Sequence, residues 1–350
     1  MKIQALHLDN YQGLKNLDVR FTPPESPKPL AITVIAGVNG SGKTTLLNFL
    51  KTIVTKPFLG PANGFIDVER NDVIQRCTFS DQKLFHNGGV CNVNKVIYFT
   101  AEQSPDKVAL DLSQALLAYV DKVVYDDGLA ANDAYNNIKR VFDEIFGQLG
   151  MAVKFHRITR DKKVLFENSD GNTFGPESLS SGERKLIAKV LPLFLEKVKG
   201  ALVMFDEPED SLHPAWQSHF LGLIRRVVEL NEEDCQVIIA THSPQIIGSA
   251  KSEELRVLTR DSEGNTHADY VEEGPYGWTV ADVLASIQHV KGQRDPEILK
   301  KLEHLRELVR DGRLEEAREV MEPLENIIGF SDADLVMIRM DITRQERKNA

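Results

Sequence analysis

GVNGSGKT, residues 37–44, lies between an apolar run at 30–36 and a second apolar run, LLNFL, at 46–50. This order predicts a strand, a phosphate-binding loop and a helix. The spacing fits GxxxxGK[ST], in which glycines let successive backbone N–H groups face phosphate oxygens without an intervening Cβ. Lys43 would reach the β and γ phosphates, and Thr44 would offer a hydroxyl to Mg²⁺. A ligand-free glycine-rich turn is the alternative, which the flanking strand and helix disfavour.

Two carboxylates follow another apolar run much later in the chain. Ala201 to Phe205 is apolar throughout and leads directly into Asp206 and Glu207. At the end of a buried strand beside a phosphate loop, Asp206 is suited to hold Mg²⁺ through water. Glu207 is suited to polarise an attacking water. Acidic residues are common at strand ends, so this interpretation depends on the phosphate loop being present.

Two shorter motifs contribute further candidate site residues. In LSSGE, residues 179–183, the small residues Ser180, Ser181 and Gly182 would leave helix N-terminal N–H groups free to meet a phosphate. An ordinary helix N-cap with Glu183 in the first turn is the alternative. His242 follows the apolar run Val237 to Ala240, where it could contact a γ-phosphate and the catalytic water, or be structural.

The pattern of apolar residues predicts an α/β fold in which strands and helices alternate between residues 183 and 243. Earlier, alternation predicts two strands at 3–8 and 17–21 around a turn, and residues 56–94 are mixed. Helical spacing predicts a small helical lobe at about 105–150, followed by a hairpin over 153–174. Three amphipathic helices are expected at 298–309, 314–328 and 335–342. We therefore divide the chain into residues 1–260 and a mainly helical C-terminal region, 261–350.

Composition narrows the class of protein. The net charge of −10 argues against a uniformly basic nucleic-acid surface, although a local basic patch is compatible with it. Residues 1–10 lack a basic start followed by an apolar core, and no apolar run approaches the ~20 residues of a membrane span. Cys77, Cys91 and Cys235 are scattered and indicate neither a zinc site nor a disulfide framework. We expect a cytoplasmic protein without a membrane partner.

The ordered motifs GVNGSGKT, LSSGE, MFDEPEDSLHP and ATHSP resemble those of the ATP-binding-cassette (ABC) ATPases. With the opening LDNYQGLKNLDVRF, the chain looks most like the branch that contains SMC proteins, RecF and the OLD-family ATPases. The resemblance covers residues 1 to about 260. It implies an ABC-ATPase head, with a mixed β lobe and a parallel sheet flanked by helices, joined to a small helical lobe and a helical C-terminal region.

The resemblance also implies roles for individual residues. ATP would be bound by the Walker A loop and by the signature motif, that is by Asn39, Gly40, Ser41, Gly42, Lys43, Thr44, Thr45, Ser180, Ser181 and Gly182. Glu207 would be the catalytic glutamate that ends the Walker B strand, and His242 the switch histidine. Glu209 to His213 would form the D-loop. Gln103, at the end of VIYFTAEQ, would be the Q-loop glutamine and would share Mg²⁺ with Thr44 and Asp206.

Two positions depart from the family pattern. Ser181 stands where the signature usually has glycine, and Gln12 stands where a basic residue often follows the aromatic.

In this family the signature of one subunit closes over nucleotide held by the Walker A loop of another, which implies a head-to-tail homodimer with two ATP sites. The segment between Thr44 and Leu179 is too short for the long coiled-coil arms of SMC proteins.

The tail at 275–342 resembles the C-terminal regions of bacterial defence ATPases of the Septu and retron-associated kind. No TOPRIM-like acidic cluster or HNH pattern is seen, so we expect any effector, a nuclease or a toxin, to be a separate chain. The first hypothesis is an ATP-gated regulatory ATPase in anti-phage defence. The alternatives are a RecF-like DNA-repair ATPase that binds nucleic acid, a transporter ATPase subunit, and a scaffold that binds nucleotide but scarcely hydrolyses it.

Overall fold

The protein is described here from a computed structural model, which describes residues 1–55, 62–80, 83–86, 95–101, 103–290 and 294–349. The chain forms two compact units, Met1–Gln288 and His289–Ala350. Strand β14 (Thr266–Asp269) and helix α7 (Val280–Ser286) lie in the first unit. The contacts thus divide the chain later than residue 260, where the sequence analysis placed the boundary.

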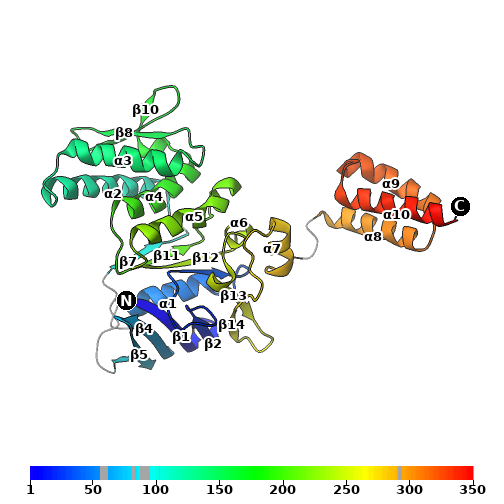
Figure 1. Ribbon diagram of the computed structural model, residues 1–350, viewed down its shortest axis with the longest axis horizontal. Helices are drawn as coiled ribbons and strands as arrows, with labels where there is room; N and C mark the ends of the chain where they lie inside the picture. Colours follow the sequence, from blue (N-terminus) through cyan, green and yellow to red (C-terminus); the bar gives the residue numbers. More distant parts are fainter. Residues whose placement is uncertain (56–61, 81–82, 87–94, 102, 291–293, 350) are drawn as a thin grey trace. The chain divides into compact units, whose positions relative to one another are not determined.

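A six-stranded sheet in the order β14-β13-β3-β12-β11-β7 lies at the centre of the first unit (Figure 1). Its parallel strands are β3 (Ile32–Ala36), β7 (Lys95–Phe99), β11 (Ala201–Asp206), β12 (Gln236–Thr241) and β13 (Leu255–Arg260), with β14 antiparallel at one edge. Every residue of β3, β11 and β12 is buried. Continuous apolar runs are what a strand covered on both faces requires.

The two faces of this sheet belong to different cores. Because side chains alternate across a strand, Val34 and Phe205 join one core, whereas Ile35 and Met204 join the other. The first core contains α2 (Pro105–Tyr125), α3 (Ala131–Phe146), α4 (Ser181–Leu195) and α5 (Pro214–Leu230). The second contains α1 (Lys43–Thr55) and the N-terminal sheet. These two layers hold the parallel sheet between them (Figure 1).

The N-terminal sheet is antiparallel and five-stranded, in the order β2-β1-β4-β5-β6. Its strands are β1 (Lys2–Tyr11), β2 (Leu14–Arg20), β4 (Asn63–Arg70), β5 (Val73–Ser80) and β6 (Lys83–His86). The region 56–94, for which the sequence analysis expected only a mixed segment, therefore supplies three strands within its described part. Cys77 on β5 is disulfide-bonded. Its pairing was not expected, because it depends on the fold and not on spacing along the chain.

The helical lobe carries a small three-stranded sheet of β8 (Lys154–Ile158), β9 (Val164–Glu167) and β10 (Thr173–Phe174). The expected hairpin is thus three strands, since the turn at 168–172 interrupts the second one. Short helices α6 (Pro244–Ile247), Pro176–Ser178 and Ser252–Glu254 complete the unit. Among the described residues, no helix combines the length and the apolar character needed to span a membrane.

The second unit consists of α8 (Pro296–Arg310), α9 (Leu314–Ile328) and α10 (Ala333–Asn349). Its apolar residues, among them Leu305, Leu324 and Leu335, form a third core of their own. The third helix extends beyond the expected Leu335–Ile342, because its last turns are polar and give no amphipathic signal.

Candidate functional site

The loop between β3 and α1 has a backbone that requires glycine. A Cβ on Gly37 would lie 2.6 Å from Ser41 Oγ and 2.8 Å from the Leu258 carbonyl oxygen. Gly42 has φ +104°, and its Cβ would lie 2.5 Å from Leu14 Cδ2. Ser41 Oγ is buried and has no hydrogen-bond partner among the described residues. The loop is therefore a backbone cradle with a spare hydroxyl, which suits phosphate oxygens.

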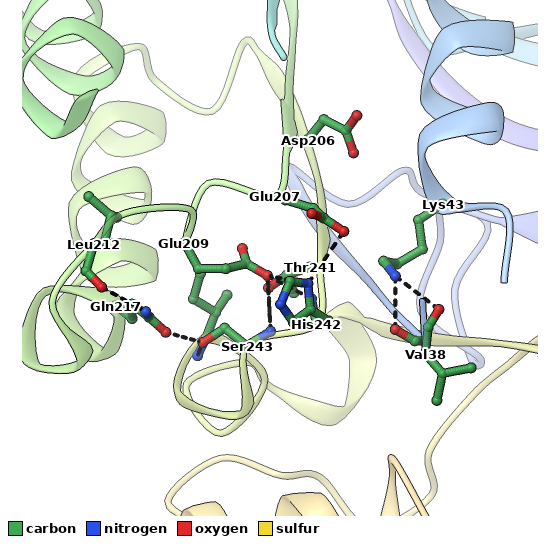
Figure 2. A network of polar contacts seen from close by, with 12 residues as sticks. Val38, Lys43, Asp206, Glu207, Glu209, Leu212, Gln217, Thr241, His242 and Ser243 are labelled. Carbon is green, nitrogen blue, oxygen red and sulfur yellow. Dashed lines mark hydrogen bonds and ion pairs between the residues drawn. The ribbon is translucent and has the colours of Figure 1, made fainter. Parts of the chain in front are cut away.

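Lys43 is folded back onto this loop (Figure 2). Its Nζ donates to the carbonyl oxygens of Gly37, at 2.9 Å, and Val38, at 3.2 Å, and only 4% of the residue is exposed. Burial lowers the pKa of the Lys43 ammonium, and the carboxylates of Glu207, Glu209 and Asp206 act in the opposite direction. The ammonium thus lies buried within the field of three acids.

The proposed Mg²⁺ ligands Thr44 and Asp206 are in direct contact. Thr44 Oγ1 donates to Asp206 Oδ1 at 3.0 Å, and the Tyr98 hydroxyl donates to Asp206 Oδ2 at 3.3 Å. Burial raises the pKa of Asp206, which is 2% exposed, and burial together with the Asp206 charge raises the pKa of Tyr98. A hydroxyl and a buried carboxylate at hydrogen-bond distance form an oxygen set of the kind that Mg²⁺ prefers.

Glu207 follows Asp206 and lines a cleft next to the phosphate loop. Its φ of +46° is unusual for a residue with a Cβ, and its N–H donates to the Ala240 carbonyl oxygen at 2.9 Å. The cleft has a volume of about 280 Å³ and is lined by Asn39, Gly40, Gly42, Lys43, Thr44, Thr45, Glu207 and Arg260. Arg260 is the residue in this set that the sequence analysis did not name.

His242 lies between two carboxylates. Its Nδ1 is 3.3 Å from Glu207 Oε1 and 3.3 Å from Glu209 Oε1, and 44% of its side chain is exposed (Figure 2). Gln288 Nε2 donates to the His242 carbonyl oxygen at 2.6 Å. The turn after β12 therefore brings the imidazole to Glu207 from a second strand end.

Glu209 holds this turn in place. Its Oε1 accepts hydrogen bonds from Thr241 Oγ1 at 2.7 Å, from the His242 N–H at 2.7 Å and from the Ser243 N–H at 3.0 Å. The sequence analysis placed Glu209 in the D-loop but not among the site residues. The sequence does show a second glutamate directly after Pro208. The hydrogen-bond partners of Glu209 lie more than 30 positions further along the chain, so no local pattern connects them.

The signature residues lie at the start of α4. Ser180 is the N-cap: its Oγ accepts from the Glu183 N–H at 3.3 Å, while Glu183 Oε2 accepts from the Ser180 N–H at 3.0 Å. This is the N-cap alternative of the sequence analysis, and it leaves Ser181 exposed. A Cβ on Gly182 would lie 2.7 Å from the Ser211 carbonyl oxygen, so glycine permits α4 to approach the 209–213 loop.

The structure does not bring every predicted residue to the cleft. Ser180, Ser181 and Gly182 are not among the described residues that line it, and neither is Gln103. Gln103 instead lines a separate cavity of about 150 Å³ with Tyr98, Lys185 and Lys189. Within one chain, the residues that line the cleft are those of the phosphate loop, Glu207 and Arg260. Asp206 contacts Thr44, and His242 contacts Glu207.

Comparison with known proteins gives two family models. "AAA ATPase domain" matches residues 1–86, and "AAA domain, putative AbiEii toxin, Type IV TA system" matches residues 99–248. The chain is 25% identical to "Septu protein PtuA" of Bacillus thuringiensis, over 84% of this chain and 86% of that protein. It is 26% identical to "Retron Vc95 probable ATPase" of Vibrio cholerae, over 46% of this chain and 32% of that protein.

A solved structure of an SMC head bound to the C-winged helix domain of ScpA is similar in fold. The TM-score is 0.56 at 15% identity, and the match covers 77% of this chain and 98% of that one. At this level of identity the likeness concerns the fold. It agrees with the α/β head expected from the motifs.

Proposed function

We propose that this chain, which is similar to the Septu and retron-associated ATPases, acts as an ABC-type ATPase of the SMC, RecF and OLD-like branch. The chain would bind ATP with Mg²⁺, hydrolyse it, and use the ATP-bound state to control a separate effector in prokaryotic defence. The observation that carries this proposal is the meeting of four strand ends: the loop after β3, Tyr98 of β7, Asp206 at the end of β11 with Glu207 directly after it, and His242 after β12.

The residues fit ATP and Mg²⁺ by their chemistry. Asn39, Gly40, Ser41, Gly42, Lys43 and Thr45 would hold the phosphates, supported by the glycine cradle and the unpartnered Ser41 hydroxyl. Thr44 and Asp206 would hold Mg²⁺. Gln103 lines a separate cavity together with Tyr98, the hydrogen-bond partner of Asp206, and would have to move from there to become a further ligand. When bound, Mg²⁺ would neutralise charge on the phosphate oxygens. Lys43 would exchange its two backbone carbonyl acceptors for phosphate oxygens, which are stronger partners for an ammonium.

Hydrolysis would depend on Glu207 and His242. Glu207 lines the cleft and would accept a proton from the water that attacks the γ-phosphate. His242, beside Glu207 Oε1, would orient that water and donate to a γ-phosphate oxygen. Glu209 would keep the imidazole in place through three hydrogen bonds to residues 241–243.

The ATP site would be completed by a second copy of the chain. The N-terminus of α4, with Ser180, Ser181 and Gly182, offers N–H groups and the positive end of the helix dipole. Because these residues do not line the cleft of their own chain, a head-to-tail pair would place each signature on the partner's nucleotide. The ATP-dependent pair is the form that we expect to engage the effector in the cytoplasm. The Septu and retron relatives support the assignment to defence.

Phosphate release and ATP binding test the proposed ATPase activity together. Glu207→Gln should lower kcat by roughly 10²- to 10⁴-fold, as loss of a general base does, while ATP binding measured by calorimetry persists. Lys43→Ala should abolish binding, and Lys139→Ala, an exposed position on α3, should behave like the unaltered protein. Unchanged turnover in the Glu207 variant would remove that residue as the base.

A further inference from the structure

The pairing of β13 with β3 places Arg260 at the cleft beside the phosphate loop. It ends β13, which pairs in parallel with β3 through Leu255 with Val34 and Val257 with Ala36. The carboxyl ends of neighbouring parallel strands lie at the same edge of a sheet, and β3 runs into the phosphate loop. Arg260 therefore emerges beside that loop and lines the same cleft as Lys43 and Thr44.

The guanidinium lies close to two glycine backbones. A Cβ built on Gly42 would be 3.9 Å from Arg260 Nη2, and one built on Gly13 would be 3.6 Å from it. Gly13 belongs to the turn between β1 and β2, where Gln12 and Gly13 have φ values of +45° and +89°. Arg260 thus lies near both the phosphate loop and the turn in which Gln12 replaces the basic residue usual in the family.

Arg260 has no structural task comparable with that of its neighbour Arg256. Arg256 is fully buried and donates to the backbone carbonyls of Arg20, Thr22, Glu253 and Leu255. Arg260 is exposed, and among the described residues its guanidinium has no hydrogen bond or ion pair. A guanidinium is always positively charged and carries five N–H donors in a planar fork. At the edge of a phosphate loop, this geometry and this charge suit phosphate oxygens.

We propose that Arg260 is a nucleotide-binding residue that contacts the polyphosphate of ATP, supplying from β13 the positive charge that Gln12 lacks. This inference rests on the proposed function and extends it to a residue outside the recognised motifs. The contact is charge-assisted and faces solvent on one side. It should therefore strengthen binding, and salt should weaken it.

Calorimetric titration of ATP and ADP into the full chain tests the contact without relying on turnover. All proteins carry Glu207→Gln to prevent hydrolysis. Arg260→Gln should weaken ATP binding by about tenfold, the loss expected for a charge-assisted hydrogen bond at an open site, and should reduce the salt dependence of Kd. Arg260→Lys should recover part of the affinity. Arg160→Ala, in the exposed turn between β8 and β9, is the matched control and should bind as the parent does.

Each outcome separates the two proposals. Equal ATP affinity in the parent and in Arg260→Gln would overturn the role of Arg260 and leave the proposed function standing. A parent that binds no ATP would overturn both. Loss of affinity together with a lower melting temperature in Arg260→Gln, without recovery in Arg260→Lys and with an unchanged salt dependence, would assign Arg260 to support of the β1–β2 turn and contradict the phosphate contact.

Discussion

The Glu209 carboxylate joins two loops that carry different parts of the site. One oxygen, Oε1, accepts from Thr241, His242 and Ser243, and the residue is only 6% exposed. Ser243 Oγ in turn donates to Gln217 on α5 at 2.7 Å (Figure 2). The buried Glu209 carboxylate, which accepts three hydrogen bonds on one oxygen, therefore sets the position of His242.

Glu209→Gln should separate positioning from nucleotide binding. The amide is neutral and replaces one carboxylate oxygen with an NH₂ donor, so charge-assisted bonds of about 1.5–3 kcal/mol each are weakened. We expect phosphate release to fall at least tenfold while the Kd for ATP changes less than threefold. An unchanged kcat would show that His242 is held without this carboxylate. Glu233→Gln, on an exposed turn, is the control.

Lys189 on α4 provides a prediction about stability and pH. It is 5% exposed, its Nζ has no hydrogen-bond partner among the described residues, and burial lowers its pKa from 10.5 to about 8. Below pH 8 both the folded and the unfolded chain hold the proton, so the cost of the buried charge is fully present. Between pH 8 and 10.5 only the unfolded chain keeps this proton. The free energy of unfolding therefore increases as pH rises through this range.

Lys189→Met should therefore be more stable than the unaltered chain at pH 7, by ~2 kcal/mol. The difference should shrink as pH rises from 8 toward 10.5. Urea unfolding at several pH values measures it, with exposed Lys139→Met as the control. A variant that is less stable at pH 7 would mean that the ammonium has a stabilising partner.

At the scale of elements, the start of α4 has two roles that can be separated. Ser180 caps the helix reciprocally with Glu183, and we propose that it also faces the partner's nucleotide. Ser180→Asp keeps a good N-cap, so stability should change by less than about 0.5 kcal/mol. The added negative charge should abolish ATP-dependent pairing, measured by light scattering. Thr279→Asp, at the capped start of α7, should leave pairing intact.

Sequence patterns predicted the elements that are buried on both faces. Continuous apolar runs identified β3, β11 and β12, and the alternation of strands and helices predicted over residues 183–243 contains α5. The strands β4 to β6 were not resolved from the mixed segment, because β5 is mostly exposed and lacks a clean alternation. Arg260 was missed for a different reason. Its proximity to Gly42 arises from the pairing of β13 with β3, which no local pattern encodes.

At the scale of the whole molecule, the cores of the two units are separate clusters. A chain that ends after Val290 keeps Gln288, whose amide bonds the His242 carbonyl. We expect this shortened chain to unfold cooperatively and to bind ATP within twofold of the full chain, as calorimetry and circular dichroism can measure. Loss of folding or of ATP binding would show that residues 291–350 contribute to the ATPase head.

The proposed ATP site is shared between two chains, and the mass of the Glu207→Gln variant in solution tests this sharing. We predict one chain without nucleotide and two chains with ATP and Mg²⁺, measured by light scattering. The same protein with Lys43→Ala added should remain a single chain in both conditions. A mass that stays at one chain when ATP is demonstrably bound would contradict the account, because the signature at Ser180 to Gly182 would then not close over a partner's nucleotide.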